Sequence, residues 1–253
     1  MTKNTCHNCN NNFNGDFCNF CGQGLYANKR LKFKDIIADF LDNTFNLHRG
    51  FFFTFWQLMV RPEVVVGDYI KGRRKRYTNP TRYLVIALAI QGLINYLSVS
   101  DELLKSEKPP SFSFLSEQLI ESMHYWQLAL ALDYGLLSNA IEALMFPVGF
   151  YLLFRALRYS YTELLVASFY FVSNSIFIAI LTVTPANLVF DIHINAKTVM
   201  HIIVAYYLWA GMRFFKQNHP ILRFLKLVLA IFIFIILRFI MLPLLLGYMF
   251  PIH

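Results

Sequence analysis

Directly before an apolar stretch over residues 83–99 lie four consecutive basic residues: Arg73, Arg74, Lys75 and Arg76. Lys and Arg beside a first membrane span stay on the cytoplasmic side, because moving strongly hydrated charges across a bilayer is unfavourable. The pattern predicts a span that begins near Pro80, with the chain before it in the cytosol. It also predicts that the basic run contacts anionic phospholipids.

The composition places the chain among membrane proteins. Hydrophobic residues make up 57% of the 253 residues and charged residues only 15%, a balance that is rare in soluble domains. Five apolar stretches are long enough to be predicted as transmembrane helices: 81–99, 136–157, 163–183, 198–215 and 227–250. The predicted fold class is therefore an all-α polytopic membrane protein, with its transmembrane domain over residues 81–253.

The distribution of Lys and Arg predicts the orientation of these spans. Most of these residues precede the first stretch or lie at alternate ends of the later ones, around residues 155–158 and 213–226. The positive-inside rule then predicts a cytoplasmic N-terminus and an external C-terminus. The net charge of +8 reflects this topology and does not indicate nucleic-acid binding. The lipid bilayer is the expected partner, and association into an oligomer is compatible with the pattern.

All four cysteines lie near the amino terminus in two Cys-x-x-Cys pairs: Cys6, Cys9, Cys18 and Cys21. Four thiolates at this spacing can surround one Zn²⁺ ion, and Gly22 allows the backbone to turn beneath it. Disulfides are the weaker alternative in a reducing cytosol, and a redox pair lacks the surrounding strand and helix pattern. His7 is a further candidate ligand, but four thiolates already complete a site. The pattern predicts a zinc ribbon over residues 1–28 that serves as a folding device or docking head.

The segment 29–80 is predicted to form short cytosolic or interfacial helices. Apolar residues recur at helical spacing over 31–47, which suits an amphipathic helix at the membrane interface. The apolar segment 51–60 is too short for a hydrocarbon layer that needs about 20 residues, so it is expected to lie in the interface or to re-enter. Another short helix is expected over 63–71, directly after Pro62.

The residues up to Pro80 resemble a known family. After the ribbon, which ends in Cys18-x-x-Cys21-Gly22-Gln23, the resemblance rests on a spaced set of residues: Thr54, Leu58, Arg61, Pro62, Tyr69, Gly72, Arg74, Tyr77 and Pro80. In these features the chain resembles a bacterial membrane-protein family catalogued only as domain-of-unknown-function family 3667. The resemblance implies a multi-span protein of the bacterial inner membrane with a tethered zinc ribbon. It implies no activity.

The loops between the spans carry further expectations. Residues 100–133 are rich in acidic side chains and are predicted to be external. Within them a helix over 111–132 is expected to lie along the outer surface as a lid or brace, with substrate capture as the alternative. Pro147 and Gly149 are expected to bend the second span. Pro185 is expected in the external loop after the third span.

Polar side chains within the apolar stretches indicate a candidate site, because a charge in hydrocarbon is retained only with a partner or water nearby. At a rise of about 1.5 Å per residue, four of them reach comparable depths on four spans: Gln91, Glu142, Asn174 and Arg238. One hypothesis is a structural Glu142–Arg238 ion pair, with Gln91 and Asn174 as hydrogen bonds between helices. The other is a cavity, open to the exterior, that receives a polar or zwitterionic group such as a lipid head.

The sequence contains no common enzyme motif. Gly-x-Ser-x-Gly, His-Glu-x-x-His, P-loop and dinucleotide glycine patterns are all absent. Two hypotheses about function remain. The first is a non-enzymatic scaffold or accessory protein whose zinc ribbon docks a protein partner. The alternative is a small transporter or lipid-handling protein that uses the intramembrane polar cluster.

Overall fold

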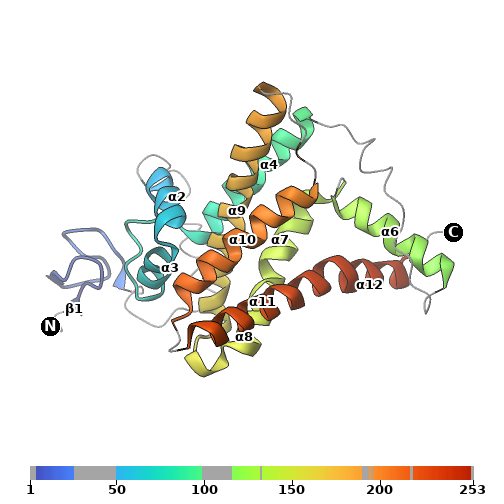
Figure 1. Cartoon of the computed structure of the whole chain (residues 1–253). Helices are drawn as coiled ribbons and strands as arrows, with labels where there is room; N and C mark the ends of the chain where they lie inside the picture. Colours follow the sequence, from blue (N-terminus) through green and yellow to red (C-terminus); the bar gives the residue numbers. More distant parts are fainter. Residues whose placement is uncertain are drawn as a thin grey trace.

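The chain folds into helices preceded by a small β-ribbon, which confirms the mainly helical class (Figure 1). The computed structural model describes residues 4–25, 50–98, 116–131, 133–189, 194, 196–216 and 219–251. The helix expected over 31–47 lies outside these residues, as does the first part of the helix expected over 111–132.

The elements begin with two antiparallel strands, β1 (Asn4–Thr5) and β2 (Asn12–Phe13). The N-terminal helices are α2 (Phe51–Val60), α3 (Pro62–Ile70) and α4 (Pro80–Ser98). They are followed by α6 (Glu117–Ala131), α7 (Gly135–Met145), α8 (Pro147–Leu153), the 3₁₀ turn η2 (Arg155–Leu157) and α9 (Tyr161–Val189). The last elements are α10 (Ala196–Phe214), α11 (Pro220–Ile236), the π-helical turn η3 (Leu237–Met241) and α12 (Leu242–Met249).

The centre of the bundle is α9. It contacts α4, α7, α8 and α10, and also the short helices α2 and α3. Its buried side chains include Ser168, Ser173 and Ser175, whose small size lets neighbouring helices approach closely. By contrast, α11 exposes large apolar side chains such as Ile221 and Leu225. Such a surface suits a lipid environment, because large exposed apolar patches are rare on soluble monomers.

Three helical stretches are long and apolar enough to cross a membrane: Gly135–Leu153, Tyr161–Ala186 and Pro220–Met249. Each overlaps one of the five predicted spans. The described apolar part of α4, Pro80–Ile94, is shorter, and α10 is not one of the three among the described residues. The structure therefore supports a helical membrane protein with three candidate spans.

Two helix boundaries differ from those predicted. α9 continues through Pro185 to Val189, so this proline lies inside a helix and not in a loop. A proline removes only one backbone donor, and apolar membrane helices tolerate it. α11 begins at Pro220, earlier than the predicted residue 227, because the fixed φ of proline suits the first helical turn. The second stretch is interrupted at Phe146, directly before Pro147, where a bend was predicted.

The start of α4 has the cap that a helix N-terminus requires. The side-chain oxygen of Asn79 accepts hydrogen bonds from the amides of Thr81 and Arg82, at 2.9 and 3.3 Å. The first turn of a helix leaves its amides without partners inside the helix, so this side chain satisfies two of them. Pro80 follows at the first helical position and needs no partner.

Loss of this cap should measurably destabilise the protein. We expect Asn79→Ala to lower the free energy of unfolding by about 1 kcal/mol, and the midpoint of thermal unfolding in detergent by about 2–4 °C. Asn79→Ser, which keeps an acceptor oxygen at the cap, should recover much of this loss. Equal midpoints for the alanine variant and the unchanged protein would show that the cap contributes nothing.

Candidate functional site

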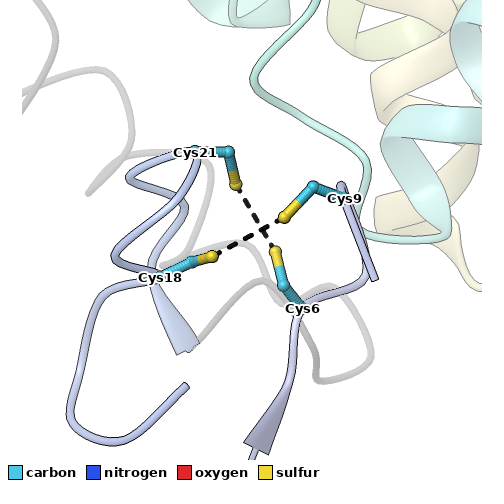
Figure 2. Close-up of side chains that lie close together, drawn as sticks. All are labelled: Cys6, Cys9, Cys18 and Cys21. Carbon is cyan, nitrogen blue, oxygen red and sulfur yellow. Dashed lines mark hydrogen bonds between the residues drawn. The ribbon is translucent and has the colours of Figure 1, made fainter. Parts of the chain in front are cut away.

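The four cysteine side chains point toward one common centre (Figure 2). Their sulfur atoms all lie within 4.8 Å of one another. The Sγ atoms of Cys6 and Cys21 are 3.5 Å apart, and those of Cys9 and Cys18 are 3.6 Å apart. Cys6 and Cys18 are buried against Phe13, whereas the other two thiols are half-buried. Each Cys-x-x-Cys pair therefore contributes one buried and one half-buried sulfur.

The two Cys-x-x-Cys turns have the same backbone geometry. In the first, the amide of Asn10 donates to the carbonyl of Cys6 at 2.9 Å, and in the second the amide of Gly22 donates to the carbonyl of Cys18 at 2.7 Å. Asn10 and Gly22 both adopt a left-handed conformation, with φ of 60° and 69°. Glycine and asparagine tolerate this conformation best. The repeated turn brings all four sulfurs to one side.

This arrangement fits a tetrahedral metal ion. Zinc–sulfur bonds of about 2.3 Å place the sulfurs of a four-cysteine site roughly 3.8 Å apart. A disulfide would need about 2.05 Å. A hydrogen bond from the backbone of Cys21 lowers the pKa of Cys18 to about 6, while burial raises the pKa of Cys6. A bound cation overcomes the burial effect, because a coordinating thiol loses its proton. The four cysteines can therefore hold a metal ion.

A second candidate site is a partly open cavity of about 230 Å³ between α4, α7, α10 and the C-terminal stretch. Its wall is mostly apolar, with a minority of polar side chains: Gln91, Ser138, Asn139, Glu142, Tyr207 and Arg238. The volume is that of several water molecules at about 30 Å³ each. The structure thus brings three of the four residues of the predicted polar cluster to one cavity inside the bundle.

The two charged residues of the cavity do not pair with each other. Glu142 accepts a hydrogen bond of 3.4 Å from the Tyr207 hydroxyl, and Arg238 Nη2 donates to the hydroxyl of Ser138. No salt bridge joins Glu142 and Arg238, both of which the structure describes. Arg238 is only 7% exposed, and its Nε atom has no hydrogen-bond partner. Buried polar groups of this kind are satisfied by water or a ligand.

Asn174, the fourth residue of the predicted cluster, does not line the cavity. Its side chain accepts a hydrogen bond from the Tyr83 hydroxyl at 2.9 Å and donates to Met59 Sδ at 3.3 Å, so it faces α4 and α2. Counting residues along a helix predicts depth, but the direction around the helix axis depends on packing. The next residue, Ser175, contacts the Tyr207 hydroxyl at 3.0 Å and connects α9 to the cavity instead.

Three polar residues of the cavity were not predicted from the sequence. Ser138 and Asn139 precede Glu142 by four and three residues on one helix, so all three share a face, and this spacing could have identified them. Asn139 donates to the side-chain oxygen of Gln91 at 2.7 Å, which connects α7 to α4. Tyr207 carries no comparable signal, because the chain contains 14 tyrosines.

Arg238 lies in the π-helical turn η3, inside the long C-terminal stretch. Such turns interrupt the regular α-helical hydrogen bonds and recur at functional sites. From α6, Gln127 donates to the carbonyl of Phe239 at 2.8 Å, and Leu130 lines the cavity. The backbone of α6 also packs closely against Gly247 of α12. α6 therefore lies beside the cavity, in a position that suits a lid or a brace.

The β-ribbon packs against the loop that carries the basic run, residues 71–79 between α3 and α4, here called the basic loop. The side chain of Gln23 donates to the carbonyl of Gly72 at 2.6 Å and accepts from the amide of Arg74 at 3.2 Å. His7 contacts the carbonyl of Lys71 through Nδ1 at 3.3 Å and is not part of the cysteine cluster. These three contacts are all to backbone groups of the loop, so through them the ribbon holds the main chain of the loop.

The four members of the basic run have different surroundings. Arg73 is exposed and pairs with Asp68 at 3.3 Å. Arg74 is buried, with its guanidinium over an aromatic ring. Lys75 and Arg76 are both exposed. Three of the four residues predicted to contact anionic lipids therefore lie at the surface, and Arg74 does not.

The loop leads into a buried junction between α2, α3, α4 and α9. The hydroxyl of Thr54 accepts from the amide of Thr78 at 2.9 Å, and the Tyr170 hydroxyl donates to the carbonyl of Thr78 at 2.6 Å. The Tyr69 hydroxyl accepts from Asn79 Nδ2 at 3.2 Å. Side chains of three helices thus hold one short stretch of main chain just before α4.

Most of this junction, namely the contributions of α2, α3 and α4, lies in the part of the chain that matches a family model. Residues 48–92 match the model of a family described as a protein of unknown function (DUF3667). The matched range covers α2, α3, the basic loop and most of α4. No curated protein and no solved structure matches the chain.

The match supports the resemblance to a family of unknown function, and the structure shows where the resembling residues lie. Most of them are buried in or next to the junction: Thr54, Leu58, Pro62, Tyr69, Arg74, Tyr77 and Pro80. Gly72 adopts a φ of 90°, which favours glycine. The residues on which the resemblance rests therefore lie mainly at the junction between the basic loop and α4, and they identify no reaction.

Proposed function

We propose that this chain is a non-enzymatic membrane protein that binds a small zwitterionic group between its helices, as a small transporter or a lipid-handling protein. The observation that carries the proposal is the cavity that Glu142 and Arg238 share without pairing. In a purely structural ion pair the two charged groups would contact each other directly, because their attraction offsets the cost of desolvation only at close range and in good geometry. Charges held apart in a membrane interior favour a partner that comes from outside.

The charges assign the two ends of the ligand. A guanidinium binds phosphate or carboxylate through parallel hydrogen bonds, and Arg238 lines the cavity with this group. Glu142, oriented by Tyr207, accepts an ammonium group. The apolar wall, which includes Ile203 and Phe234, contacts the carbon atoms between the two charges. A lipid headgroup and a free zwitterionic solute share this chemistry.

The proposed topology has five spans. α4 and α10 each contain 19 residues, or about 28 Å at a rise of 1.5 Å, which is close to the roughly 30 Å hydrocarbon layer. They complete the three candidate spans in a bacterial inner membrane, with a cytoplasmic N-terminus and an external C-terminus. Contacts near the proposed cytoplasmic end support this orientation: Arg213 pairs with Glu63 at 3.0 Å, and Lys226 lies over the ring of Phe154.

The proposed metal is Zn²⁺, held by Cys6, Cys9, Cys18 and Cys21. Four thiolates in a tetrahedron are the donor set of structural zinc sites. Such a closed site has no open position for water or substrate, so the ion supplies folding energy. The close sulfur atoms and the matching backbone turns support this assignment.

A scaffold or accessory role is the second candidate, and two exposed aromatic side chains on the ribbon favour it. Phe17 and Phe20 lie on either side of Cys18 and are 64% and 78% exposed. Exposed aromatic side chains are enriched in protein-docking surfaces. In this role the ribbon binds a protein partner, and substitutions in the cavity leave function unchanged.

Thermal unfolding of the purified full chain in detergent tests the first candidate. O-phosphoethanolamine carries both an ammonium and a phosphate group, whereas ethanolamine carries only the ammonium and glycerol phosphate only the phosphate. We expect O-phosphoethanolamine to raise the unfolding midpoint most, because a ligand at 100 times its Kd stabilises by about 2.7 kcal/mol. Arg238→Gln and Glu142→Gln should each abolish this rise. Native mass spectrometry of retained phosphatidylethanolamine and phosphatidylglycerol distinguishes a lipid source from a soluble one.

Ser173→Ala is the matched control. The buried hydroxyl of Ser173 donates a hydrogen bond to the carbonyl of Phe169 in its own helix, and Ser173 does not line the cavity. The control should respond to O-phosphoethanolamine as the unchanged protein does. The proposal is wrong if neither the zwitterion nor a lipid binds, or if Arg238→Gln and Glu142→Gln bind them normally.

A further inference from the structure

The ribbon and the basic loop are connected by hydrogen bonds through a single residue, Gln23. Gln23 belongs to the second cysteine turn, because its carbonyl accepts the amide of Cys18 at 2.8 Å. The side chain of the same residue bonds to the main chain of the loop on both sides of Arg73. Gln23 itself is only 3% exposed. The conformation of the cysteine turn therefore fixes the residue that holds the loop.

The loop also meets the other cysteine turn. His7 contacts the carbonyl of Lys71 at 3.3 Å. In the second turn, a side chain added at Gly22 would lie 3.7 Å from Nζ of Lys75, so this turn passes directly beside the lysine. Gly72 has a left-handed φ of 90° at the centre of these contacts. The loop thus has a defined shape that depends on both turns.

The basic loop presents two cationic side chains that have no acidic partner among the described residues. Within the described part of the chain, neither Lys75 nor Arg76 has an acidic partner, and both are exposed. The guanidinium of Arg76 lies over the ring of Phe53, 5.3 Å from its centroid. α2 also exposes Phe52 and Trp56, at 75% and 65%. Cations beside exposed aromatic residues fit the boundary between headgroups and acyl chains.

The position in the fold favours a membrane surface as the occupant. Arg76 lies four residues before Pro80, where α4 begins, so its charge lies near the membrane end of a proposed span. In Figure 1 the ribbon, α2 and α3 lie together on one side of the molecule, away from α6. An anionic lipid surface is complementary to this charge, and each Lys or Arg near it contributes about a fivefold preference.

We propose that the ribbon is a metal-dependent clamp that holds the basic loop in the shape that binds anionic phospholipid headgroups through Lys75 and Arg76. The inference is independent of the cavity, and it rests on the proposed metal. Metal binding fixes the cysteine turns, Gln23 transmits their position to the loop, and the loop presents Arg76 beside α2 and Lys75 beside Gly22 of the ribbon. Without the clamp the loop loses this shape, and its two charges no longer keep these positions.

Trp56 provides a local reporter, because it lies one helical turn from Phe53 and Arg76 covers the ring of Phe53. The chain has three tryptophans, so Trp126→Phe and Trp209→Phe leave Trp56 alone. The full chain is reconstituted in liposomes that contain either brominated phosphatidylglycerol or brominated phosphatidylcholine at the same mole fraction. We expect the anionic lipid to quench Trp56 more strongly.

Two further variants separate the clamp from the charges. Lys75→Ala with Arg76→Ala should remove the preference, at about fivefold for each residue. Gln23→Ala should weaken it while stoichiometric zinc is retained, and removal of zinc by chelation should weaken it in the otherwise unchanged reporter. Arg155→Ala, which removes an exposed charge elsewhere in the bundle, should leave the preference intact.

Each result decides the inference. Equal quenching by both lipids would show that no anionic headgroup binds beside α2. If the preference for anionic lipid survives both Gln23→Ala and chelation of zinc, the clamp is wrong. If Arg155→Ala loses as much of the preference as Lys75→Ala with Arg76→Ala, the preference reflects the net charge of the protein and not the basic loop. A reporter protein that contains no zinc when purified would refute the proposed metal without testing the cavity.

Discussion

Cys18→Ser is expected to remove the metal and to unfold the ribbon as a unit. Metal binding supplies about 10–16 kcal/mol to small zinc domains at neutral pH, far more than a ribbon of this size can gain from its few buried side chains. Among the residues that the structure describes, the buried core around the cysteines contains only Phe13 as a large side chain. We therefore expect the N-terminal 28 residues to become sensitive to protease, while the helical domain stays folded.

Two measurements check this expectation. Elemental analysis should give one zinc per chain for the unchanged protein and none for Cys18→Ser. Limited proteolysis should cut the variant within the ribbon at protease concentrations that leave the unchanged ribbon intact.

His7→Ala is the matched control for this experiment. It changes a residue between Cys6 and Cys9 that contacts the basic loop and lies outside the cysteine cluster. This variant should keep its zinc. Folded protein that carries no metal, or equal loss of metal in the His7 variant, would contradict the four-cysteine assignment.

Gly149→Ala is expected to have the second large effect, because α8 and α11 approach each other closely at this residue. A Cβ atom at position 149 would lie 2.7 Å from the carbonyl oxygen of Ala230 and 3.1 Å from its Cα. These are backbone atoms, so relief requires the two helices to move apart. Overpacking of this kind costs about 1–3 kcal/mol. The expected fall in the thermal midpoint is therefore several degrees in a protein of this size.

Gly67→Ala is the control for the intrinsic effect of alanine. Gly67 lies inside α3, and an added Cβ there would meet nothing within 4 Å. Alanine is better than glycine inside a helix by up to about 1 kcal/mol, so this variant should be as stable as the unchanged protein or more so. Equal midpoints for both glycine variants would argue against the packing of α8 on α11.

The features that were predicted correctly depend on short stretches of sequence. The start of α4 at Pro80, the interruption before Pro147 and the turn at Gly22 each depend on neighbours within a few residues. The apolar stretches likewise predicted three candidate spans, because length and composition are local properties. The same local information failed at Pro185, where the surrounding apolar helix continues past the proline.

The candidate site shows where local information ends. Depth along a helix follows from residue number, and it predicted Glu142, Arg238 and Gln91 together. Whether a side chain at that depth faces the cavity depends on how the helices pack. In this packing Asn174 faces away from the cavity and Tyr207 faces into it. No pattern in the sequence indicated Tyr207.

The sequence alone was sufficient for the class of protein, the ends of many helices and the four cysteines, because these follow from composition, spacing and backbone preferences. It was not sufficient for the contact of Gln23 with the basic loop, the burial of Arg74 or the separation of Glu142 from Arg238. Each of these depends on atoms that are far apart in the chain. Their positions follow only when the helices and the ribbon pack together, since packing sets the direction of each side chain.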